Sequence, residues 1–320
     1  MALGTGQLTT TTGATFVPQL WSDDIAAAYK HNLVFANNIT QWYHSDKPGA
    51  VVNVPSPSRN TATNIYGSQG AALTFTAPTE NTFAVTINQH WATPKQIPDI
   101  AEKQFLGSYR KFITDDIGYS LAVAIDSYLW LTARLFAGAS QDAGVVIAGD
   151  GTTLWNPSAN GNAGNASNLT DQGIRKVIQS LDDNDVPGTE RFVALPPVEK
   201  NRLLGNARFS EQAFTGEVAG GNSIRTGKVG NLYGMDVYVS ANSPSVAATN
   251  GTTFVRGVVI AHKDSMILIN QILPRVQSQY KLEFLSDVLV ADCAFGAAVV
   301  RTGGAANYVA DRGRMLYTPA

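Results

Sequence analysis

The stretch GNLYGMDVYVSANSP, residues 230–244, contains a sharply defined strand. Apolar side chains recur at every second position from Met235 to Val239, which is typical of a strand with one buried face. A glycine-rich turn can bind phosphate when a helix follows and offers its free N–H groups, but here a strand follows. We therefore assign Gly230 and Gly234 to the backbone, one to the turn and one to the entry into the strand at Asp236, where φ is positive or the packing is too close for a side chain. The stretch predicts a core strand and not a ligand site.

Three further segments have the character of strands. RFVALPPVEKNRLL, residues 191–204, indicates a buried strand that runs through two prolines into a short helix. GVVIAHKDSMILINQ, residues 257–271, indicates strands on either side of a Lys-Asp turn. RVQSQYKLEFLSDVLVADCAFGAAVV, residues 275–300, adds a returning strand and an apolar segment. A helix capped by Thr170 precedes them, so residues 170–270 are expected to form an α/β unit.

The N-terminal part is organised differently. The first twenty residues are rich in Thr and Gly and predict an extended arm, with a short amphipathic helix over 17–33. From 46 to 97 the apolar residues alternate, which predicts a long two-stranded hairpin with an irregular tip. An isolated hairpin is marginal in water, so this one needs another surface, either its own core or a neighbouring copy. The alternating positions are Val52, Val54, Leu73, Phe75, Phe83, Val85 and Ile87.

The strongest helical pattern follows the hairpin. From Leu106 to Leu135 apolar residues recur at about 3.6-residue spacing. Pro98 in the first turn marks the start, and an unbroken helix over 98–136 would be roughly 58 Å long. Gly107 and Gly118 are the positions where it would bend. The pattern includes Tyr109, Ile113, Ile117, Leu121, Ala124, Tyr128 and Leu131 on the same face.

The composition limits the classes of function. Charged residues make up only 15% of the 320 residues, against roughly 25% in typical soluble domains, which favours a chain that hides surface in subunit contacts. A formal net charge of −2 provides no basic field for sequence-specific DNA binding. Cys293, the single cysteine, excludes a disulfide framework and is expected to be a small buried hydrophobe. The N-terminus lacks a signal-peptide pattern, and no run reaches the ~18 apolar residues of a membrane span.

Groups that could carry chemistry are scattered. The four histidines, His31, His44, His90 and His262, have no metal-pair spacing, and no nucleophile elbow or phosphate-binding loop occurs. Asp115 and Asp116 point about 100° apart on a helix and cannot flank one bond. The cluster of Asp182, Asp183 and Asp185 is a turn that could hold Ca²⁺. We therefore expect no catalytic, cofactor-binding or metal-binding residues.

The order of these elements resembles the major capsid protein of tailed double-stranded DNA bacteriophages. The four segments at 191–204, 230–244, 257–271 and 275–300 carry the resemblance, after the hairpin and the long helix. It implies an α+β fold with an N-terminal arm, an extended β-hairpin loop, a long spine helix in a peripheral domain, and an α/β axial domain. The implied boundaries are 1–45 for the arm, 46–97 for the extended loop, 98–169 with 271–297 for the peripheral domain, and 170–270 with 298–320 for the axial domain.

The resemblance implies a shell subunit without enzymatic activity. It would assemble with itself into hexamers and pentamers of an icosahedral capsid, enclosing DNA without sequence-specific binding and without a membrane. The implied location is the virion, with assembly in the host cytoplasm, and the further partners are a portal and a cement or decoration protein. Some relatives carry a removable N-terminal scaffolding region; here the arm begins near Met1, so a separate scaffolding protein is expected. Lys47 and Lys95 lie at the base of the hairpin and none lies at its tip, so no lysine crosslink to a neighbour is expected.

Two other functions are compatible with the sequence. The first is a cellular nanocompartment shell protein of the same fold, which would enclose an enzyme. The second is a hydrolase with its site in the loops at 141–169 and 205–229, with Asp182 or His262 as candidate groups. DNA inside the particle would distinguish the first, and a polar cluster in one pocket would favour the second.

Overall fold

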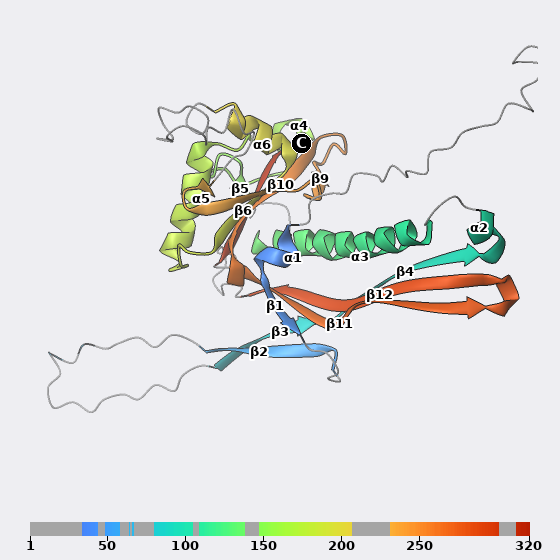
Figure 1. Ribbon diagram of the computed structural model, residues 1–320. Helices are drawn as coiled ribbons and strands as arrows, with labels where there is room; N and C mark the ends of the chain where they lie inside the picture. Colours follow the sequence, from blue (N-terminus) through green and yellow to red (C-terminus); the bar gives the residue numbers. More distant parts are fainter. Residues whose placement is uncertain are drawn as a thin grey trace, which may run out of the picture.

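The computed structural model describes residues 34–43, 49–57, 64, 66, 80–104, 109–137, 147–206, 231–300 and 312–320. The helix expected over 17–33, the strand around Leu73 and Phe75, and almost all of the loop at 205–229 lie outside these residues. The described chain forms a mixed α and β structure with two parts, an α/β body and an elongated body, which lie against each other (Figure 1).

The α/β body is built on a seven-stranded sheet. Six strands lie in the order β5-β13-β10-β6-β8-β7, and β9 pairs with β10. The sheet is mixed, since β6 and β8 are parallel whereas β10 is antiparallel to both β6 and β13. The strands are β5 (Ile147–Ala148), β6 (Arg191–Leu195), β7 (Asn231–Leu232), β8 (Met235–Val239), β9 (Ser245–Ala247), β10 (Phe254–His262) and β13 (Gly313–Pro319).

The stretch at 230–244 supplies a strand of this sheet, as predicted. β8 begins at Met235, which is buried, and follows β7 through a two-residue turn. In that turn Tyr233 has φ of 52° and Gly234 has φ of 81°, the positive values that tight hairpin turns require. Gly234 therefore allows the backbone to make the turn. In the strand that follows, Asp236 pairs with Phe192 of β6.

Helices accompany the seven-stranded sheet. α5 (Asp171–Asp183) begins where the sequence predicts, because the hydroxyl of Thr170 accepts a hydrogen bond of 3.0 Å from the N–H of Gly173. α6 (Pro197–Leu204) follows β6 and begins with a proline in its first turn. The short α4 (Ala159–Asn162) lies in the loop between β5 and α5.

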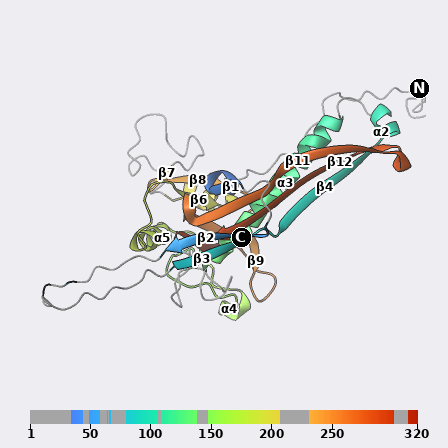
Figure 2. The same cartoon turned by 90° about the horizontal axis from the view of Figure 1, so that it is seen from below.

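The elongated body combines a four-stranded sheet with the longest helix. Its strands lie in the order β1-β11-β12-β4, where β1 is Thr40–Tyr43, β4 is Gln89–Pro98, β11 is Met266–Lys281 and β12 is Ser286–Val299. The separate strands expected before and after Gln271 form one strand, β11, with irregular register between Asn270 and Arg275. Figure 2 shows β11, β12 and β4 running alongside α3 to the far end of the molecule.

The helix predicted over 98–136 is observed in parts. α2 (Asp99–Gln104) follows β4 directly, α3 (Tyr109–Ala133) supplies 25 residues, and a 3-10 turn covers Arg134–Ala137. α3 continues through Gly118, and Gly107 lies outside the described residues. Leu131 shares the helical spacing of the other apolar residues but is 45% exposed, whereas its neighbour Trp130 is buried.

The hairpin has two described strands, β2 (Val51–Pro57) and β3 (Glu80–Thr86), which pair antiparallel. Its base lies on its own elongated body, where Val85 packs with Ile267 and Ile269 of β11. Gly296 of β12 permits this contact, since a Cβ there would lie 2.9 Å from the Cα of Ile87. The alternating pattern through Phe83, Val85 and Ile87 does not continue as one strand: β3 ends at Thr86, and β4 pairs with β12 in a different sheet.

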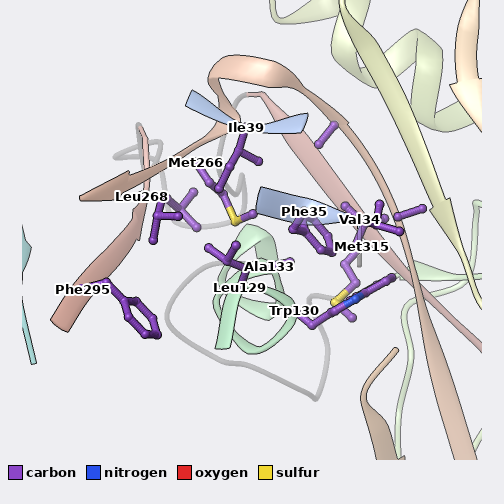
Figure 3. Close-up of a cluster of buried hydrophobic side chains, with 14 of the residues drawn as sticks. Val34, Phe35, Ile39, Leu129, Trp130, Ala133, Met266, Leu268, Phe295 and Met315 are labelled. Atoms are coloured by element: carbon purple, nitrogen blue, oxygen red, sulfur yellow. The ribbon is translucent and has the colours of Figure 1, made fainter. Parts of the chain in front are cut away.

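One hydrophobic core joins the two bodies. It contains side chains of α3, of β11 and β12, and of β6, β10 and β13. The short helix α1 (Phe35–Asn38) and the residues beside it enter this core, and Figure 3 shows Val34, Phe35 and Ile39 among side chains from these elements. The N-terminal segment of the described chain thus lies at the junction of the bodies.

Candidate interaction surfaces

The groups proposed for a hydrolase site have structural roles. His262, at the end of β10, is buried, and its Nδ1 accepts a hydrogen bond of 3.1 Å from the N–H of Asp264. Burial lowers the pKa of His262, which favours the neutral ring that this bond requires. The carboxylate of Asp182 accepts a bond of 2.6 Å from Arg191, whose guanidinium also donates to backbone carbonyls of residues 186 and 187. Arg191 and His262 are cross-strand partners, so Arg191 lies near both candidate groups. Its guanidinium stabilises the segment that follows the C-terminal end of α5.

The acidic and thiol groups likewise give no reactive cluster. Asp115 and Asp116 are exposed on α3, and Asp183 and Asp185 are exposed at the end of α5. Within the described ranges no three His, Cys, Asp or Glu side chains are grouped so as to hold a metal ion. Cys293 is buried on β12, and burial raises the pKa of its thiol, as for an unreactive core cysteine.

An ion pair ties the middle of the four-stranded sheet together. Arg275 of β11 donates two bonds, of 2.9 and 3.0 Å, to the two carboxylate oxygens of Asp292 on β12. His90 of β4 places Nε2 3.3 Å from the same carboxylate. The hydrogen bonds from Arg275 lower the pKa of Asp292, while partial burial opposes them. The three groups link three adjacent strands just beyond the irregular part of β11. The other two histidines besides His90 and His262, His31 and His44, lie outside the described residues.

The most distinctive surface is the far end of the elongated body. Here β11 turns into β12 through a 3-10 turn at Leu282–Phe284, and Leu285 has φ of 43°. Leu282 is 78% exposed and Leu285 65% exposed, and Phe284 and Ile100 of α2 are exposed too. We call this set, Ile100, Leu282, Phe284 and Leu285, the tip. Figures 1 and 2 both place it at the end remote from the seven-stranded sheet.

Hydrogen bonds connect the parts of the tip. The N–H of Asp99 donates to the carbonyl of Leu285 at 3.1 Å, and the hydroxyl of Tyr280 donates to the Asp99 carboxylate at 2.6 Å. These bonds fix α2 to the turn that carries the apolar side chains. A group of exposed large apolar residues at one end of a molecule is typical of an interaction surface. Sequence patterns alone do not indicate this surface, because LEFL looks like the end of a strand.

The hairpin offers a second surface. Among the residues that the structure describes, one face of the hairpin packs on the chain's own sheet, through Val52, Val54, Phe83 and Val85. On the other face Val51 is 48% exposed, and Asn53 and Pro55 are exposed beside it. We expected the hairpin to need another surface, and at its base this surface is the sheet of its own subunit. Residues 67–79 of the hairpin lie outside the described chain.

Comparison with solved structures decides the fold. No family model and no curated protein matches the sequence. A capsid structure of Helicobacter pylori bacteriophage KHP30 superposes with a TM-score of 0.72 at 10% identity, covering 99% of each chain. The chain has the tailed-phage capsid fold. The capsid of Cyanophage P-SCSP1u matches 99% of this chain and 95% of its own at a TM-score of 0.71 and 16% identity. A chain of Mycobacterium phage Che8 matches 94% and 97%, at 0.69 and 20%.

The capsid fold confirms the predicted α+β class over nearly the whole chain. At these identities the likeness establishes the arrangement of the backbone, whereas residue roles must come from this chain itself. No helix within the described ranges is long and apolar enough to cross a membrane.

Proposed function

We propose that this protein is a structural shell subunit, without enzymatic activity, which assembles with itself into an icosahedral phage capsid that encloses double-stranded DNA. The observation that carries the proposal is the match to a phage capsid subunit over 99% of both chains. The exposed apolar tip and the charged fraction of 15% support it independently, since both fit a chain whose surface is covered by other copies.

We propose that hexamers and pentamers form the capsid, in the virion, after assembly in the host cytoplasm. A separate scaffolding protein, a portal and a decoration protein are proposed partners. The near-neutral net charge of −2 supports enclosure of DNA by confinement instead of by strong binding. The similar structures reported above come from phages, so no observation favours the nanocompartment alternative.

We propose the domains that the sequence predicts, an arm at 1–45, an extended loop at 46–97, a peripheral domain at 98–169 with 271–297, and an axial domain at 170–270 with 298–320, with two changes. Pairing of β13 with β10 supports the place of the C-terminal residues in the axial domain. Because β5 pairs with β13, we assign Ile147 and Ala148 to the axial domain. Because β11 begins at Met266, we assign residues 266–270 to the peripheral domain.

The test is to express the full chain, alone and with the products of neighbouring genes, and to analyse it by sedimentation velocity and electron microscopy. The expected result is closed megadalton shells, and particles from infected cells should contain nuclease-protected double-stranded DNA. A stable monomer under all of these conditions, absent from any particle, would refute the proposal. Particles that hold an enzyme in place of DNA would support the nanocompartment alternative.

A further inference from the structure

The segment 34–39 is wedged between the two bodies. Phe35 meets Trp130 of α3 edge to face, with ring centroids 4.6 Å apart, and meets Phe192 of β6 in the same manner at 5.9 Å. Val34, Phe35 and Ile39 are all buried. Figure 3 shows Phe35 close to Trp130 of α3 and Met315 of β13, with Ile39 beside Met266 of β11. The segment therefore contacts both bodies at once.

A buried carboxylate fixes this wedge. Asp126 of α3 is 1% exposed, and its Oδ1 accepts hydrogen bonds from the N–H groups of Val34 (3.1 Å) and Phe35 (3.0 Å). Its Oδ2 accepts a bond of 3.0 Å from the side-chain amide of Asn242, which follows β8 in the α/β body. Val34, the N-cap of α1, makes no capping bond with its own side chain, so Asp126 supplies the cap from another helix.

The donors to Asp126 come from two separate parts of the chain, the segment at 34–39 and the α/β body. A buried carboxylate is tolerated when its oxygens are hydrogen-bonded, and it becomes costly when donors are withdrawn. In the described part of the chain no Lys or Arg forms an ion pair with Asp126 that would replace them. Movement of either part relative to α3 thus breaks bonds to the same buried charge.

We propose that residues 34–39 couple the N-terminal residues to the angle between α3 and the α/β body, with Asp126 as the positioning residue. While residues 34–39 are packed between the two bodies, one angle between α3 and the α/β body is strongly favoured. When these residues leave, the two bodies can adopt a wider range of angles. By thermodynamic linkage, a partner that draws residues 1–33 away favours the other angles to the same extent. The coupling is a property of a single copy, so it stands or falls separately from shell assembly.

A merely local anchor would look different. An anchor for the N-terminal residues alone needs the bonds that Val34 and Phe35 donate to Asp126, but it does not need the bond from Asn242 or the ring contact with Phe192. These two contacts reach the α/β body. They predict that changes at Asp126 alter the geometry between the bodies as well as the attachment of the segment.

The experiment measures that geometry in the full chain. Spin labels are placed at Asp116→Cys on α3 and Asn201→Cys on α6, both exposed positions, in a Cys293→Ala background, and the distance distribution is recorded by pulsed electron paramagnetic resonance. In Asp126→Ala the width of the distribution should rise about twofold. Asp126→Asn should keep the original width, because its amide oxygen still accepts from α1 and its NH₂ group can pair with a reversed Asn242 amide.

Ser127→Ala, at the exposed neighbouring position on α3, is the matched control and should leave the distribution unchanged. An unchanged distribution in Asp126→Ala, even with a lower melting temperature, would overturn the coupling and leave Asp126 a local cap. If Asp126→Ala does not fold, Asn242→Ala decides the question, because it removes only the donor from the α/β body. Asn242→Ala must broaden the distribution, and the original width there would equally overturn the proposal.

Discussion

The seven-stranded and four-stranded sheets differ in how much of their apolar surface the chain itself covers. In the α/β body, β6 is buried along its whole length, and so are the last six residues of β10. In the elongated body β11 is buried only over its first five residues, and its last nine are exposed. The α/β body thus stabilises itself, whereas the far half of the elongated body leaves apolar groups for another surface to cover. The two bodies should therefore respond differently to the same kind of substitution.

The largest effect on subunit stability is expected in the α/β body. Leu195 of β6 is fully buried, so Leu195→Ala removes packed methyl groups and leaves a cavity. The free energy of unfolding should fall by about 2–5 kcal/mol, measured by denaturant titration of the unassembled subunit. Leu154→Ala, at a position 52% exposed, is the control and should change it by about 0.5 kcal/mol or less. Equal losses from both variants would contradict the difference between covered and uncovered surface.

A smaller loss is expected where the hairpin crosses the sheet. In Gly296→Ala the new Cβ meets the backbone at Thr86 and Ile87, so the hairpin base must shift. We expect a loss of about 1–3 kcal/mol in the free energy of unfolding, together with faster hydrogen exchange in β3. Gly118→Ala is the matched control, because a Cβ there meets nothing within 4 Å and alanine favours the helix. It should stabilise the subunit, and a loss at Gly118 equal to that at Gly296 would mean that close packing is not the cause.

The sequence predicted the local elements well and their pairing poorly. Period-two patterns located β2 and β8, a buried apolar run located β6, and Thr170 marked the start of α5, since these depend on neighbouring residues. The break after Thr86 was missed because it depends on the pairing of β4 with β12, about 200 residues later in the chain. The tip was missed for a related reason. An apolar run such as LEFL has the same composition whether a sheet covers it or solvent does, and only the fold shows which.

The smallest effect on the subunit and the most selective effect on assembly are expected at the tip. Leu282→Ser with Phe284→Ser changes two exposed side chains, so the free energy of unfolding should change by about 0.5 kcal/mol or less. Shells should nevertheless fail to form, because the substitutions remove the apolar surface that a second copy would cover. Sedimentation velocity measures the shells, and calorimetry of the unassembled subunit measures stability.

Leu131→Ser provides the control for this last variant, since Leu131 is also an exposed leucine of the elongated body but lies outside the tip. It should assemble as the original sequence does. Normal shell yield from the double variant would show that the tip is not a subunit contact, while shells from the unaltered chain would still support the proposed function. Loss of shells accompanied by an unfolded subunit would instead place the tip with the buried core. The difference between the two bodies therefore predicts that substitutions at this turn abolish shell assembly without lowering the stability of the subunit. A substitution at a buried position should instead lower the stability.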